Sequence, residues 1–145
     1  MRNKKLFIMI KLLTYVIERV MIVDDDPTDL YILNRILKKN NFAKIITQFS
    51  SPEKALQHLL SNHKKNFFFP QMIFLDINMP LMNGFEFLNE FNKIPENIIR
   101  NTKVIILSST CDPRDFDKMK AYPNSLMFFE KPLKSEDLDL ISTIL

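Results

Sequence analysis

The sequence predicts an α/β fold in which five parallel strands form a doubly wound sheet with helices on both faces. Two observations predict it. Short apolar runs of strand length alternate five times with segments whose apolar residues recur at helical spacing. Polar residues that start helices or carry chemistry follow most of these runs. Such alternation is typical of parallel strands joined by right-handed helical crossovers, and 145 residues suffice for one domain of this kind.

The predicted strands are apolar runs, many of them rich in β-branched residues. They comprise residues 20–23, 43–49, 72–75, 104–107 and 126–129. The third run is unbroken, as expected for a strand buried on both faces, and Asp76 follows it. Beyond it stands Gly84, the only glycine, for which we expect a backbone geometry that other residues avoid.

The helices are predicted from their start signals and apolar stripes. Three begin with a capping residue followed by proline, which the first helical turn tolerates. These pairs are Asp26-Pro27, Ser51-Pro52 and Asp112-Pro113. Another helix follows Gly84, and the last opens at Ser135 with two acids where the helix dipole favours them. Residues 92–102 are expected to form a polar loop, with a further helical turn as an alternative.

Charge is distributed unevenly along the chain. The net charge is +3, but residues 1–19 hold five basic residues and one acid, so the remainder carries −1. The body therefore lacks a nucleic-acid charge signature, and we expect no nucleic-acid partner. The single cysteine, Cys111, permits no internal disulfide. It fits a reducing compartment, so we expect a cytoplasmic protein.

Residues 1–18 are interpreted as an extension that precedes a domain at 19–145. Their apolar run at 6–10 is too short for a secretory signal, and no stretch is long enough for a membrane span. Apolar residues between positions 6 and 20 recur at helical spacing, which leaves a short amphipathic helix open. We favour an extension that is poorly ordered or loosely docked.

Side chains that carry chemistry stand at the carboxyl ends of four predicted strands. They are Asp24 and Asp25, then Asp76, then Ser108, then Lys131. With the strand order 2-1-3-4-5 they meet at one edge of the sheet, where ligands bind in open α/β folds. Three carboxylates repel one another, and Mg²⁺, with a backbone carbonyl near Asn78 as a further ligand, would relieve the repulsion. The hydroxyl of Ser108 and the ammonium of Lys131 suit a phosphoryl group on Asp76.

Four motifs occur in a fixed order. They are Val-Asp-Asp-Asp-Pro at 23–27, Leu-Asp-Ile-Asn-Met-Pro-Leu-Met-Asn-Gly at 75–84, Leu-Ser-Ser at 107–109 and Lys-Pro at 131–132. Over residues 19–145 the chain thereby resembles the receiver domains of two-component response regulators, the CheY-like family with a flavodoxin-like (βα)5 fold.

The resemblance implies that Asp76 accepts a phosphoryl group from a sensor histidine kinase or a phosphotransfer protein. Asp25 and Asp76, with the Asn78 carbonyl, would bind Mg²⁺ directly, and Asp24 would act through water. Ser108 would move toward the phosphoryl group, and Lys131 would pair with it.

The resemblance also assigns roles around these residues. Phe128 takes the position of a switch aromatic that is often tyrosine, so it lacks a hydroxyl for a partner. Asn78 and Thr110 take positions that influence dephosphorylation, and the Lys131-Pro132 bond is expected to be cis. Switching would remodel the fourth helix, fifth strand and fifth helix for a downstream protein partner.

Because the sequence ends soon after the fifth helix, we expect a single-domain response regulator of a phosphorelay. It would catalyse only its own phosphorylation and dephosphorylation, so we do not expect an enzyme with turnover. One alternative is a haloacid-dehalogenase-like phosphatase, whose DxDxT motif residues 24–28 match, although it gives no role to Asp76 or Gly84. A flavodoxin is disfavoured by three acids where its phosphate loop needs small and hydroxyl residues. A receiver fold used as a constitutive docking module is a further alternative.

Overall fold

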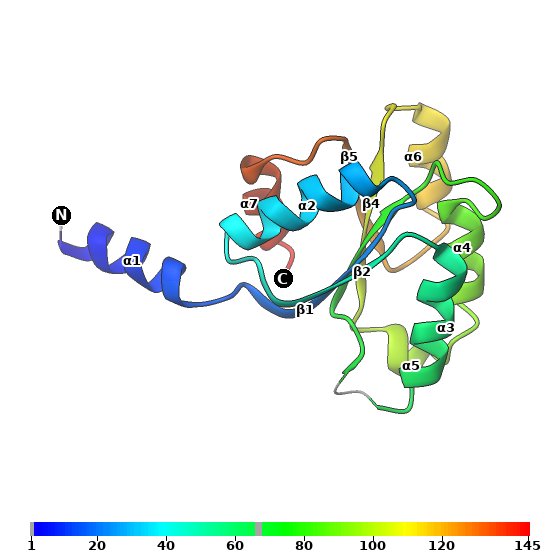
Figure 1. Ribbon diagram of the computed structural model, residues 1–145, viewed down its shortest axis with the longest axis horizontal. Coiled ribbons are helices and arrows are strands. Elements are labelled where there is room, and N and C mark those ends of the chain that lie inside the picture. The colour runs from blue at the N-terminus through cyan, green and yellow to red at the C-terminus, as the bar shows by residue number, and fades with distance from the viewer. Residues whose placement is uncertain (1, 66–67) are drawn as a thin grey trace.

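The computed structural model describes residues 2–65 and 68–145, and its five strands form one parallel sheet in the order β2-β1-β3-β4-β5. The strands are β1 (Ile17–Val23), β2 (Ala43–Phe49), β3 (Met72–Asp76), β4 (Lys103–Ser108) and β5 (Ser125–Glu130). The helices are α1 (Arg2–Leu13), α2 (Pro27–Lys39), α3 (Pro52–Asn62), α4 (Gly84–Phe91), α5 (Glu96–Ile99), α6 (Pro113–Met119) and α7 (Ser135–Ser142). Figure 1 shows helices on both faces of the sheet. The predicted fold class and strand order are confirmed.

Two apolar cores lie on opposite faces of the sheet. Met72 and Phe74 of β3 belong to the core that α2 and α7 cover, whereas Ile73 and Leu75 belong to the core under α3, α4 and α6. Successive side chains of a strand point to opposite faces, so a strand covered on both sides needs apolar residues at every position. The unbroken apolar run before Asp76 follows from this burial.

The three helix starts predicted from a cap followed by proline are present. Each cap side chain accepts a hydrogen bond from a backbone N–H inside its helix, over 2.8 Å at Asp26, 3.2 Å at Ser51 and 2.9 Å at Asp112. These bonds satisfy donors that the first turn would otherwise leave unpaired. The cap at Asp26 also fixes α2 directly after the acids at the end of β1.

The prediction of an unusual backbone geometry at Gly84 is wrong. The residue after Pro80, Leu81, has the positive φ of this loop, at 67°, whereas Gly84 does not have a positive φ. Gly84 is needed for close packing, because a Cβ there would lie 2.7 Å from Ile77 Cα and 2.8 Å from the Asp76 carbonyl oxygen. A side chain at Gly84 would therefore press on the segment that carries Asp76.

The segment at 92–102 is not entirely a loop. It contains the one-turn helix α5, which starts after Pro95. The alternative of a further turn thus holds, but the turn is a helix separate from α4.

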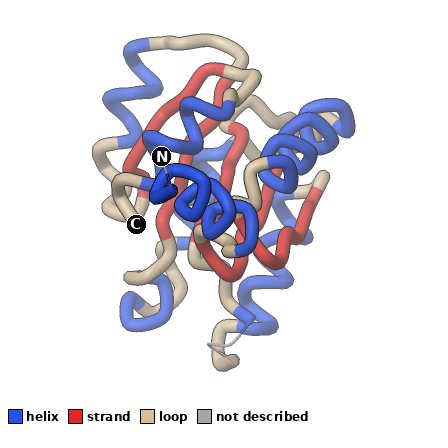
Figure 2. The backbone as a smooth tube through the Cα atoms, turned by 90° about the vertical axis from the view of Figure 1, so that its left-hand side faces the viewer, coloured by secondary structure: helices blue, strands red, loops and turns tan. Residues whose placement is uncertain are grey.

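Residues 2–13 of the N-terminal extension form α1, which projects away from the domain in Figure 1 and toward the viewer in Figure 2. This part is therefore helical, and whether it is loosely docked or binds a partner remains a prediction. The helical pattern does not continue to Val20, because β1 already begins at Ile17, whose N–H donates to the Phe42 carbonyl over 2.9 Å. None of the helices in the described residues is long and apolar enough to cross a membrane.

Candidate functional site

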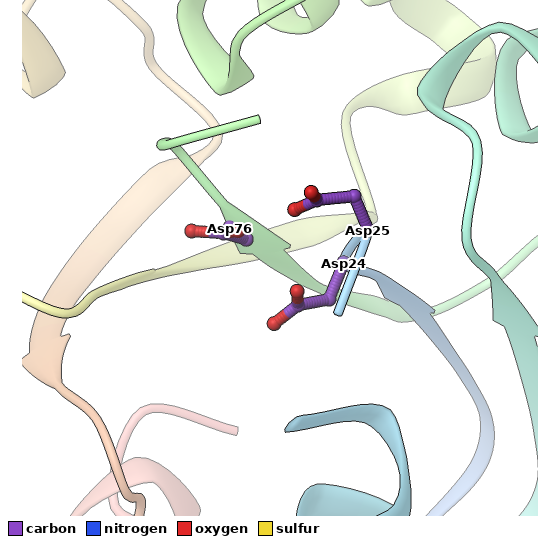
Figure 3. Close-up of side chains that lie close together, drawn as sticks. All are labelled: Asp24, Asp25 and Asp76. Atoms are coloured by element: carbon purple, nitrogen blue, oxygen red, sulfur yellow. The ribbon is translucent and has the colours of Figure 1, made fainter. Parts of the chain in front are cut away.

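Three carboxylates meet at the carboxyl edge of the sheet. Asp24 and Asp25 follow β1, and Asp76 ends β3, which pairs with β1 through Val23 and Leu75. One oxygen from each carboxylate lies within 4.8 Å of the others. Figure 3 shows the three side chains extending from the ends of two neighbouring strands. Asp24 and Asp76 are almost fully buried, and Asp25 is half-buried. The sequence-based prediction that these residues converge is correct.

Lys131 brings the positive charge to this cluster from the end of β5. Its Nζ lies 2.7 Å from Asp24 Oδ2, 2.9 Å from Asp29 Oδ2 and 3.4 Å from Asp76 Oδ2. The peptide bond from Lys131 to Pro132 is cis, as expected. The ammonium therefore donates hydrogen bonds to Asp24 and Asp29, and it faces Asp76 at ion-pair distance.

Burial and charge shift the pKa values of this cluster. Burial raises the pKa of Asp24 to about 6, against the hydrogen bonds from Lys131 and the Asp26 N–H, and the charge of Asp76 adds to the rise. Burial and then Asp76 raise the pKa of Asp25. Burial alone would lower the pKa of Lys131, but its hydrogen bonds to Asp24 and Asp29 raise it.

The pKa values of Asp24 and Lys131 both rise, although one ion pair joins the two groups. Their surroundings differ. Lys131 has three carboxylates around it, whereas Asp24 shares one ammonium with other acids and loses most of its hydration. The site thus has an excess of negative charge, which a cation would neutralise.

Ser108 ends β4 and is completely buried. Its Oγ accepts hydrogen bonds from Asn78 Nδ2 over 2.9 Å and from the Thr110 N–H over 3.2 Å. The Asn78 N–H in turn donates to Asp76 Oδ1 over 3.1 Å. Asn78 therefore links the acid at the end of β3 to the hydroxyl at the end of β4.

Phe128 lies in the middle of β5, where it pairs in register with Ile106 of β4. It is half-buried and packs against the core on the α3, α4 and α6 side of the sheet. A switch role for Phe128 remains a prediction.

One residue of the site was not predicted from the sequence. Asp29, in the first turn of α2, contacts Lys131, which lies 102 residues further along the chain. An acid in a first turn is adequately explained by the helix dipole. The sequence did contain a signal for this contact. Asp29 lies in the first turn of the helix that begins just after Asp24, so its side chain could be expected near the same edge of the sheet.

The donors at this site fit a hard divalent cation. The group offers carboxylate oxygens, two of them from nearly buried residues, and no nitrogen or sulfur ligand. Mg²⁺ prefers oxygen ligands of this type. The structure therefore supports a metal site formed by Asp24, Asp25 and Asp76, while the Asn78 carbonyl remains a predicted ligand.

The fold and the site define an α/β domain with an acidic centre and a lysine at the carboxyl edge of its parallel sheet. The chain belongs to the response regulator receiver domain family, whose sequence profile matches residues 20–142. This assignment agrees with the resemblance seen in the sequence and does not support the phosphatase or flavodoxin alternatives.

Relatives support the same family. Hybrid signal transduction histidine kinase C of Dictyostelium discoideum is 31% identical over 128 residues, which cover 85% of this chain and 10% of that protein. The chain therefore spans only a small part of this curated relative. The crystal structure of a two-component response regulator from Cytophaga hutchinsonii is 27% identical with a TM-score of 0.81, and covers 88% of this chain and 95% of that one. Chemotaxis protein CheY4 of Vibrio cholerae, at 22% identity and a TM-score of 0.72 over 89% of this chain and 99% of that one, shares the fold.

Proposed function

We propose that this protein is a single-domain response regulator of a two-component phosphorelay, and that Asp76 is its phosphoryl acceptor. The observation that carries the proposal is the convergence of Asp24, Asp25 and Asp76 with the ammonium of Lys131 at one sheet edge. Phosphoryl transfer requires an acceptor, a metal site and a positive charge that stabilises the phosphoryl oxygens. The three carboxylates and the lysine can supply these. Receiver domains take their phosphoryl group from histidine kinases, so the donor is a sensor kinase or a phosphotransfer protein.

The reaction proceeds by attack of an Asp76 carboxylate oxygen on the phosphorus of a phosphohistidine. A P–O bond forms while the P–N bond breaks, and the histidine leaves with a proton. Hydrolysis by water later releases inorganic phosphate and restores the carboxylate. In these two reactions the protein modifies only itself, so it is not an enzyme with turnover.

Chain residues prepare the site for this chemistry. Asp25, Asp76 and the Asn78 carbonyl would hold Mg²⁺, and Asp24 would act through water. When bound, the metal neutralises charge on the phosphoryl oxygens. Lys131 pairs with one of these oxygens, and Ser108 donates a hydrogen bond to another.

The switch couples this chemistry to a surface. Ser108 leaves its hydrogen bond with Asn78 and moves toward the phosphoryl group, and Phe128 turns inward. The partner then binds the surface of α6, β5 and α7. In support, each of these elements exposes a large apolar side chain, namely Phe116, Leu126 and Leu140. We place the protein in the cytoplasm, where a kinase can reach it.

The test is intact mass after incubation with acetyl phosphate and Mg²⁺. We expect the wild type to gain one phosphoryl group and Asp76→Asn to gain none. The variant Asp112→Asn is the matched control, because it removes an acid that caps a helix and does not belong to the group of Asp24, Asp25 and Asp76, so it should behave as the wild type.

Two results would contradict the proposal. No gain in the wild type would favour a constitutive docking module, and a gain that persists in Asp76→Asn would place the acceptor elsewhere. The switch has its own test, since a downstream partner must bind the phosphorylated form more tightly. Equal affinity for both forms would exclude it.

A further inference from the structure

Lys131 has more carboxylate neighbours than a single ion pair requires. Its ammonium lies 2.7 Å from Asp24, 2.9 Å from Asp29 and 3.4 Å from Asp76. Hydrogen bonds between an ammonium and a carboxylate are about 2.7–2.9 Å long. The two short contacts therefore go to Asp24 and Asp29, and Asp76 receives the weakest of the three.

The two hydrogen-bonded acids differ in exposure. The side chain of Asp24 is 4% exposed, whereas that of Asp29 is 33% exposed. If Lys131 moved away, water could hydrate the Asp29 carboxylate, but Asp24 would be left as a buried charge with a large desolvation cost. Asp29 is therefore the partner that Lys131 can release at low cost.

Asp29 does not belong to the group of carboxylates that could hold a metal ion, which comprises Asp24, Asp25 and Asp76. Nor does it serve as the helix cap, because Asp26 accepts the capping hydrogen bonds of α2, including one from the Asp29 N–H. Its side chain reaches the site through Lys131.

We propose that Asp29 is a positioning residue that competes with the phosphoryl group on Asp76 for the ammonium of Lys131. In the unphosphorylated protein it holds the lysine toward α2. Phosphorylation draws the lysine toward Asp76, and the half-exposed Asp29 becomes hydrated. Asp29 thereby weakens binding of a phosphoryl group and lowers the fraction of molecules in which Lys131 is turned toward Asp76. This inference rests on the proposed function.

The test measures the affinity of the full chain for the phosphoryl analogue beryllium trifluoride in the presence of Mg²⁺, by calorimetry. We expect Asp29→Asn to bind the analogue roughly two- to fivefold more tightly than the wild type, which is the change expected when one partly exposed ion-pair competitor is lost. Asp29→Glu, which retains the carboxylate, should stay closer to the wild type than Asp29→Asn.

Two controls separate the lysine contact from other effects. Asp26→Asn removes the same charge three residues away and keeps a good cap, but Asp26 is not among the partners of Lys131 in the described residues. The affinity of Asp26→Asn for beryllium trifluoride should differ from that of the wild type by less than twofold, because exposed charges interact only weakly. In a Lys131→Met background, Asp29→Asn should have no effect on the affinity.

The outcomes are distinguishable. Equal affinities of the wild type and Asp29→Asn, or an equal gain in Asp26→Asn, would overturn the role of Asp29 alone. Weaker binding by Asp29→Asn would also overturn it, because Asp29 would then support the lysine in the bound state. Failure of the wild type to bind the analogue would overturn the proposed function and this inference together.

Discussion

The side-chain amide of Asn78 donates a hydrogen bond to the Ser108 hydroxyl over 2.9 Å, and so ties the loop after β3 to the end of β4. The bond holds the completely buried hydroxyl in its resting place. A switch that moves Ser108 toward Asp76 must break it. Asn78 thus has a side-chain role in addition to its predicted backbone role at the metal.

Removal of this bond should favour the phosphorylated arrangement. We expect Asn78→Ala, which keeps the backbone carbonyl, to tighten beryllium trifluoride binding by roughly 0.5–1.5 kcal/mol, the net value of one hydrogen bond. Calorimetry with Mg²⁺ measures the change. In a Ser108→Ala background the same substitution should have no effect, and weaker binding by Asn78→Ala alone would show that the amide does not restrain the hydroxyl.

The raised pKa of Asp24 predicts a pH dependence of stability in the metal-free protein. The pKa of Asp24 is 3.8 in the unfolded chain and about 6 in the folded protein. At a pH between these two values the folded state binds more protons than the unfolded state, so stability falls as the pH rises. Relative to Asp24→Asn, the free energy of unfolding of the wild type should fall by up to about 3 kcal/mol from pH 4 to pH 7. Urea unfolding at several pH values measures it, and a constant difference between the two proteins would contradict the prediction.

Mg²⁺ should stabilise the folded protein, because the cation offsets repulsion among Asp24, Asp25 and Asp76. At a free concentration about 100 times the dissociation constant, the gain in the free energy of unfolding is about 2.7 kcal/mol. Thermal unfolding with and without Mg²⁺ measures it. Asp25→Asn should lose most of the gain and Asp112→Asn should keep it, whereas the same gain in all three proteins would place the metal elsewhere.

Gly84→Ala should destabilise the protein, although alanine is the better helix former. Its Cβ would lie 2.7 Å from Ile77 Cα and 2.8 Å from the Asp76 carbonyl oxygen, and those backbone atoms cannot move independently of the site. We expect a loss of about 1–3 kcal/mol, as for other overpacked positions. Urea unfolding measures it, and stability equal to or above that of the wild type would show that the loop adjusts freely.

The sequence by itself determined the five strands, the main helix that follows each of them and the order of these elements, because their signals are local. An alternation of apolar runs and helical stripes marks strands and helices, and caps such as Asp26 fix where a helix begins through bonds to neighbouring N–H groups. The strand ends also identified Asp24, Asp25, Asp76, Ser108 and Lys131 as one group, since parallel strands place their carboxyl ends at a common edge.

Only the tertiary structure decided how these residues share their partners. The contact of Lys131 with Asp29 and the bond of Asn78 with Ser108 join residues 102 and 30 positions apart, and several acids compete for one ammonium. The role of Gly84 was likewise not readable from the sequence. Glycine is required there because Ile77 lies too close for a side chain, and not because of the φ angle of Gly84. Local patterns depend on neighbours along the chain, whereas competition for a proton donor or for space depends on distances that exist only once the sheet and helices have packed.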